Sequence, residues 1–168
     1  LGLGQEYRLW HELLIHDAEW GDVLAGVSAE VYAEGGVSEG ELIMVPSNIE
    51  TRVIPMLIDD ATLLRERLEE LDEWADFVVI DTSPTPSMLH SMIYVATTHI
   101  VYPTECEMLA LEGLGKSVDH MGKLNNSRQM LNLPDAVLLG IQPTMYDVRT
   151  NAHDYGLGLI AGTFKRKT

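Results

Sequence analysis

The chain has 168 residues, of which 46% are hydrophobic and 22% are charged, and its mean hydropathy is close to zero. This size and composition exclude a disordered tail and a small disulfide-stapled scaffold, and they predict one globular domain with a substantial core. The 26 acidic and 11 basic residues give a net charge of −15, which disfavours a protein whose whole surface binds nucleic acid. The charge is uneven, because residues 1–76 carry −14 and residues 77–168 carry −1.

Cysteine content and hydropathy indicate the compartment. The single cysteine, Cys106, excludes an internal disulfide and a Cys-rich zinc site, so a reducing, cytoplasmic environment is expected. No apolar run in the sequence is long enough to cross a membrane, and no membrane attachment is evident in these residues. The six histidines lack the spacing of a metal site and are interpreted as ordinary packed or surface residues.

The predicted elements alternate along the chain. In order, they are a strand at Leu42–Val45, a helix after Asp59-Asp60 with apolar positions Leu64, Leu68, Leu71 and Ala75, a strand at Phe77–Ile80, a helix at Ser87–Val95, a strand at Ile100–Tyr102, a helix at Glu107–Leu124 and a strand at Val137–Ile141. The strands are apolar throughout, as in parallel strands covered on both faces. This order predicts an α/β fold with a mostly parallel sheet and helices on both faces.

Asp81 and Thr82 directly follow the apolar run Phe77–Ile80. A carboxylate at the end of a buried parallel strand is the pattern of a Walker B strand, in which the carboxylate holds a magnesium ion on bound phosphates. The alternative is that Asp81 or Thr82 only caps the following helix. Both interpretations remain open on spacing alone, because an apolar run followed by Asp is common in α/β proteins.

Three stretches, in matching order, resemble the ParA/Soj/MinD family of partition ATPases. Residues 80–87, Ile-Asp-Thr-Ser-Pro-Thr-Pro-Ser, resemble the family's strand and switch I-I-D-T-P-P-S, with Ser83 in place of a usual Pro. Residues 100–114 resemble its next strand and helix and include the specific string Ala-Leu-Glu-Gly-Leu. Residues 139–150 resemble L-G-V-x-x-T-M-Y-D-x-R-T. The resemblance covers most of the chain and implies a P-loop NTPase-like fold.

The resemblance also implies roles for single residues. Asp81 would be the catalytic carboxylate and the magnesium ligand. The other candidate residues would contact the nucleotide, at the γ-phosphate switch or near the adenine: Thr82, Ser83, Pro84, Thr144, Met145 and Asp147. An ordinary polar loop is the alternative for the last three. The implied cofactors are ATP and magnesium, and the implied partners are a second copy in an ATP-sandwich homodimer, a ParB-like activator or cargo adaptor, and non-specific DNA bound through regions outside this chain.

The family's phosphate-binding loop is absent from these 168 residues. The four lysines are Lys116, Lys123, Lys165 and Lys167, and none follows a Gly-rich turn that could surround phosphates. We therefore expect residues 1–168 to be a single partial domain of a longer ATPase, inactive by itself, with the P-loop strand before Leu1 and the last strand after Thr168. The alternative is an interaction scaffold that keeps the sheet but binds no nucleotide.

Overall fold

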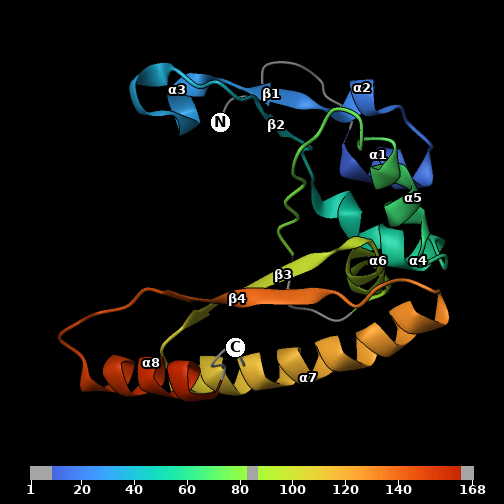
Figure 1. The fold of residues 1–168 in the computed structure, drawn as a ribbon. Helices are drawn as coiled ribbons and strands as arrows, with labels where there is room; N and C mark the ends of the chain where they lie inside the picture. The colour runs from blue at the N-terminus through green and yellow to red at the C-terminus, as the bar shows by residue number, and fades with distance from the viewer. Residues whose placement is uncertain (1–8, 83–86, 164–168) are drawn as a thin grey trace. The chain divides into compact units, whose positions relative to one another are not determined.

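The structure is a computed structural model that describes residues 9–82 and 87–163 (Figure 1). Its contacts divide the chain into two compact units, Leu1–Met92 and Ile93–Thr168. No helix in the described ranges is both long enough and apolar enough to cross a membrane.

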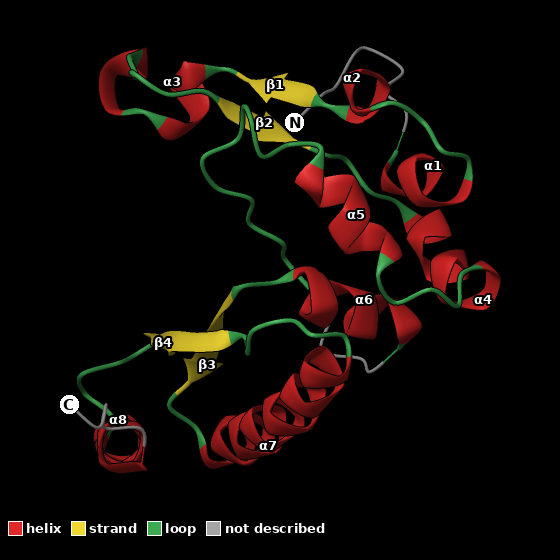
Figure 2. Cartoon of the chain, turned by 45° about the vertical axis from the view of Figure 1, so that its right-hand side comes forward, coloured by secondary structure: helices red, strands yellow, loops and turns green. Residues whose placement is uncertain are grey.

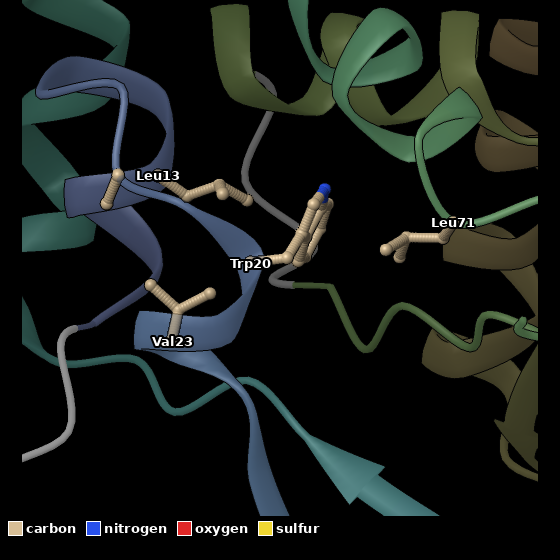
Figure 3. Close-up of a cluster of buried hydrophobic side chains, with 5 residues drawn as sticks. Leu13, Trp20, Val23 and Leu71 are labelled. Carbon is tan, nitrogen blue, oxygen red and sulfur yellow. The ribbon is translucent and has the colours of Figure 1, made fainter.

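The first unit consists of short elements. They are α1 (Trp10–Ile15), α2 (Trp20–Val23), β1 (Ala25–Val27), α3 (Ala29–Tyr32), η1 (Glu34–Gly36), β2 (Leu42–Met44), η2 (Ile49–Val53), α4 (Ile54–Leu57) and α5 (Leu63–Glu69). The core contains Leu13, Trp20, Val23 and Leu71, which Figure 3 shows converging from separate segments. The Trp20 indole N–H donates to the Arg67 carbonyl at 3.0 Å, so this large side chain is buried with its polar atom paired.

The predicted strand at Leu42–Val45 is confirmed as β2, but the parallel pairing expected for it is wrong. β2 pairs antiparallel with β1, with Gly26 opposite Ile43. Gly35 and Gly36, between the two strands, have φ values of 71° and 70°, which glycine adopts without steric cost. These residues help reverse the chain, and the partner strand Ala25–Val27 is too short to be recognised as an apolar run.

The predicted strand at Phe77–Ile80 does not form in the described part of the chain. Phe77 is 91% exposed and Val79 is 92% exposed. The two described sheets contain only the pairs β1–β2 and β3–β4, so residues 77–80 have no strand partner there. A β-strand requires backbone hydrogen bonds to a neighbouring strand, and a run of apolar side chains does not provide them.

The second unit has the predicted parallel arrangement. β3 (His99–Glu105) pairs parallel with β4 (Val137–Thr144), with Tyr102 opposite Ile141. The connecting helix α7 (Met108–Met130) and the last helix α8 (Asn151–Thr163) lie on the same side of the pair in Figures 1 and 2. Parallel strands need such a long connection, because the chain must return to the starting end of the sheet.

The predicted helices form with shifted ends. The helix expected at Ser87–Val95 is α6 (Met88–Ala96), and α7 continues to Met130 instead of ending at Leu124. α5 ends at Glu69, although Leu71 beyond it is still buried. Just before this helix, the Asp60 carboxylate accepts from the Thr62 backbone N–H at 2.8 Å and from the Thr62 hydroxyl at 2.7 Å. These hydrogen bonds lower the pKa of Asp60, because they favour its charged form.

Arg128, near the end of α7, is a buried cation with 2% exposure. Its Nη1 donates to the carbonyls of Tyr94, Val95 and Thr97 at 2.8, 2.6 and 2.8 Å, and its Nε donates to the Pro134 carbonyl at 2.7 Å. The last carbonyls of a helix have no partner within the helix, and a positive charge is favourable at that end. Arg128 therefore satisfies the end of α6 and joins it to the α7–β4 connection.

Candidate functional site

Asp81 and Thr82 are both exposed and follow residues 77–80 in the first unit. Ser83 and Pro84 lie outside the described residues. The described residues contain no group of three or more His, Cys, Asp or Glu side chains that could hold a metal ion. Magnesium keeps several water ligands and often takes only one or two carboxylates from a protein, so the single exposed carboxylate of Asp81 fits such an ion.

Thr144, Met145 and Asp147 lie together in the second unit, where β4 leads into α8. Thr144 is the last residue of β4 and pairs with Glu105 of β3. Met145 has a φ of 51°, and its side chain is 79% exposed. A left-handed conformation is uncommon outside glycine, so the chain turns sharply at the carboxyl end of the strand. This is the edge at which parallel α/β sheets bind ligands.

The carboxylate of Asp147 organises the β4–α8 loop. It accepts from Arg149 twice through the guanidinium, from Nε at 3.0 Å and Nη2 at 2.8 Å, and from the Arg149 backbone N–H at 2.9 Å. These bonds to Arg149 lower the pKa of Asp147 and raise that of Arg149, because each group favours the charged form of the other. Asp147 is thus ionised at neutral pH, and its charge is paired within the loop.

His153, in the first turn of α8, is a site residue that the sequence analysis missed. Its Nδ1 accepts from the Asp147 backbone N–H at 3.0 Å, and its Nε2 lies 4.0 Å from an oxygen of Glu107, the residue before α7. The sequence shows only a histidine six positions after Asp147, without a metal-ligand pattern. Its role depends on the approach of α8 to the β3–α7 connection, which spacing does not reveal.

Gly156 is the reason that α8 approaches this connection closely. A Cβ atom at Gly156 would lie 2.2 Å from the Cys106 carbonyl oxygen, which is far inside van der Waals contact. Nearby, the Tyr146 hydroxyl donates to the Asp154 carboxylate, and this bond raises the pKa of Tyr146 because it favours the neutral phenol. The ends of β3 and β4 and the first turns of α8 therefore form one closely connected region.

Residues 22–133 match the AAA_31 family, described as an AAA domain. The chain belongs to this family. It is 27% identical over 146 residues to the sporulation initiation inhibitor protein Soj of Bacillus subtilis, covering 84% of this chain and 52% of Soj. It is 32% identical over 104 residues to the chromosome partitioning protein ParA of Myxococcus xanthus, covering 62% of this chain and 35% of that protein.

This AAA_31 chain also matches solved structures. Cobyrinic acid a,c-diamide synthase from Mycobacterium smegmatis, crystallised with bound ADP and magnesium, aligns with a TM-score of 0.71 and 25% identity over 94% of this chain and 60% of the synthase. The chain thus spans about half the length of Soj and three fifths of the synthase. The family resemblance and the α/β, P-loop NTPase-like fold inferred from the sequence are confirmed.

Proposed function

We propose that residues 1–168 are a single partial domain of a ParA-type ATPase that binds ATP and magnesium, dimerises around ATP and hydrolyses it. ATP binding, dimerisation and hydrolysis would together drive the partition of a plasmid or chromosome, or the positioning of another cargo. The observation that carries the proposal is Asp81, an exposed carboxylate directly after an apolar segment, within residues that match the AAA_31 family. The ADP and magnesium bound by the Mycobacterium smegmatis synthase support the choice of cofactors.

The chain's own residues would act at the phosphate end as follows. Asp81 would hold magnesium directly or through its water, and Thr82, Ser83 and Pro84 would respond to the γ-phosphate. Bound magnesium supplies positive charge that offsets the charge on the phosphates. Phosphoryl transfer depends mainly on positioning and charge neutralisation, so these residues need no covalent chemistry.

The β4–α8 loop would contact the adenine. The exposed side chain of Met145 offers a polarisable apolar surface, which suits the face of an aromatic base. Thr144 provides a hydroxyl at the strand end. Asp147 would keep the loop in shape, because its carboxylate is paired with Arg149, its backbone N–H donates to His153 and its carbonyl accepts from the Thr150 N–H.

The proposed partners follow from the relatives and from charge. A second copy would complete the ATP-sandwich dimer, and a ParB-like activator or a cargo adaptor would regulate it in the cytoplasm. Residues 1–76 carry a net charge of −14, which repels phosphate backbones. Non-specific DNA binding would therefore require basic surface outside these residues.

One observation favours a second candidate, an interaction scaffold without nucleotide chemistry. No lysine among the 168 residues follows a Gly-rich turn, so the chain lacks its own phosphate-binding loop. The sequence encoded immediately upstream of Leu1 distinguishes the two candidates. A Gly-rich, Lys-containing turn there selects the ATPase, and its absence selects the scaffold.

The decisive variant is Asp81→Asn in the complete protein. It removes the charge that would hold magnesium and keeps the side-chain size, so we expect magnesium-dependent ATP turnover to fall by about 100-fold or more. Phosphate release measures this turnover. Asp76→Asn is the matched control, because Asp76 is an exposed aspartate at the other end of the same apolar segment. Unchanged turnover in Asp81→Asn contradicts the assignment of Asp81.

A further inference from the structure

We propose that His153 is a positioning residue that holds the β4–α8 loop at Asp147 through its unprotonated Nδ1. Nucleotide affinity would thereby depend on pH. The inference rests on the proposed function in one respect, the contact of this loop with the nucleotide. The interaction between His153 and the loop does not depend on the proposed function, because it is observed as contacts of His153 in the structure.

The hydrogen bond to Asp147 determines the protonation state of the imidazole. A backbone N–H can only donate, so the Asp147 N–H at 3.0 Å requires Nδ1 to be an unprotonated acceptor. In the neutral ring the proton is then on Nε2. This atom lies 4.0 Å from a carboxylate oxygen of Glu107. The negative charge of Glu107 would stabilise a positively charged ring.

The ring is fixed in place by its surroundings. The side chain of His153 is 16% exposed. One turn further along α8, the close approach of Gly156 to the Cys106 carbonyl holds the helix against the β3–α7 connection. The Tyr146 ring lies 6.2 Å from the imidazole, between ring centroids. The position of Asp147 is therefore tied to a side chain that is anchored on a different segment.

Protonation reverses the interaction. An imidazolium carries a proton on Nδ1, which would then point at the Asp147 N–H, and two facing donors repel each other. Three sets of groups lie close to the ring: Glu107 from the β3–α7 connection at 4.0 Å, the Asp147–Arg149 pair of the loop, and Tyr146, whose hydroxyl donates to Asp154 of α8. The loop is thus held when the ring is neutral and released when the ring is charged.

The direction of the pH effect follows. Histidine is the side chain that ordinarily changes charge between pH 5 and 8. If the nucleotide binds the held loop, it binds the form without the extra proton, so affinity increases as pH rises. We expect the effect in binding rather than in the chemical step, because His153 acts through the loop proposed to contact the adenine.

Enzyme kinetics on the complete protein test this coupling. We expect the KM for ATP in wild type to be about five- to tenfold higher at pH 5.5 than at pH 8, which is the equivalent of one hydrogen bond. His153→Phe keeps the ring volume without an acceptor, and should show the high KM at both pH values with little change in kcat. His153→Asn restores an acceptor that does not titrate in this range, and should show the low KM at both.

His99→Phe is the matched control, because His99 is exposed at the opposite end of β3. It should keep the wild-type KM and the wild-type pH profile. A His153→Phe protein with wild-type KM and pH profile overturns the inference, and so does one in which only kcat falls.

Amide hydrogen exchange provides a readout that needs no nucleotide. After correction for intrinsic rates, protection of the Asp147 amide should fall between pH 8 and pH 5.5 in wild type and remain constant in His153→Asn. The Val137 amide, which donates to the Thr98 carbonyl at the other end of β4, serves as the reference. If Asp147 protection in wild type is the same at both pH values, the proposed role of His153 in holding the loop is wrong. This test uses wild type and therefore remains valid if His153→Phe fails to fold. A wild type without ATP turnover but with the expected exchange contradicts the proposed function and leaves the hold on the loop supported.

Discussion

Arg128 is the residue whose role differs most from what its type suggests. A basic residue near the end of a helix is usually solvated, yet this guanidinium is 2% exposed. Four backbone carbonyls accept its hydrogen bonds. Bonds to a charged donor are stronger than neutral ones, and a buried carbonyl left without a donor is costly. The side chain therefore stabilises the second unit through polar contacts.

Replacing Arg128 by Met should destabilise the protein. The variant keeps an apolar stem of similar length but leaves the buried carbonyls of Tyr94 and Val95 without this donor, so we expect a loss of about 3 kcal/mol in the free energy of unfolding. Urea denaturation followed by circular dichroism measures the loss. Arg65→Met is the control, because Arg65 makes a partly exposed i,i+4 pair with Glu69 and should change stability by about 0.5 kcal/mol at most. Equal effects of the two substitutions would contradict the role of Arg128.

At the scale of elements, the contact between α8 and the β3–α7 connection depends on a glycine, Gly156, which has no side chain. Gly156 is buried, and the Cys106 carbonyl occupies the space that a Cβ atom would need. Glycine is otherwise unfavourable inside a helix. Close packing thus outweighs helix propensity at this position.

The glycines of α8 provide an internal comparison. Gly156→Ala should lower the melting temperature, because the added methyl group forces α8 away from backbone that cannot move freely. Gly158→Ala meets no atom within 4 Å and should stabilise the protein by about 0.5–1 kcal/mol through higher helix propensity. Thermal unfolding of both variants tests this. A Gly156→Ala protein as stable as Gly158→Ala would show that the close approach is unimportant.

The elements also show which features the sequence can predict. The sequence predicts β3, β4 and the long helix between them, because apolar runs and helical periodicity are local properties. The usual β–α–β topology then gives the parallel arrangement of the two strands. The antiparallel partner of β2 was missed, since Ala25–Val27 is only three residues long. The strand expected at Phe77–Ile80 needs a hydrogen-bonded neighbour, and an apolar pattern does not specify one.

The candidate site divides in the same way. Met145 and Asp147 were found through a resemblance, and the structure places both in the β4–α8 loop. Their roles toward a nucleotide remain predictions, as do those of Asp81 and Thr82. His153 was missed because its contact with the Asp147 backbone arises from tertiary packing, which leaves no regular spacing in the sequence.

At the scale of the whole molecule, the chain belongs to the AAA_31 family, and no lysine among its 168 residues follows a Gly-rich turn that could surround phosphates. The 168-residue polypeptide alone should therefore show no magnesium-dependent ATP turnover above background. Phosphate release measures this, with the complete protein as the positive control. Turnover by the isolated polypeptide would contradict the expectation that its lysines do not bind the phosphates.

The bonds of Arg128 also have a consequence for the order of folding. They connect residues 31 to 34 positions apart in the sequence, and β3 and most of α7 lie between them. A guanidinium is expensive to remove from water before its acceptors are in place. Collapse around Arg128 is therefore unfavourable until α6, β3 and α7 have their native arrangement. This one side chain disfavours compact misfolded states, so the second unit should reach its native packing late and in a single cooperative step.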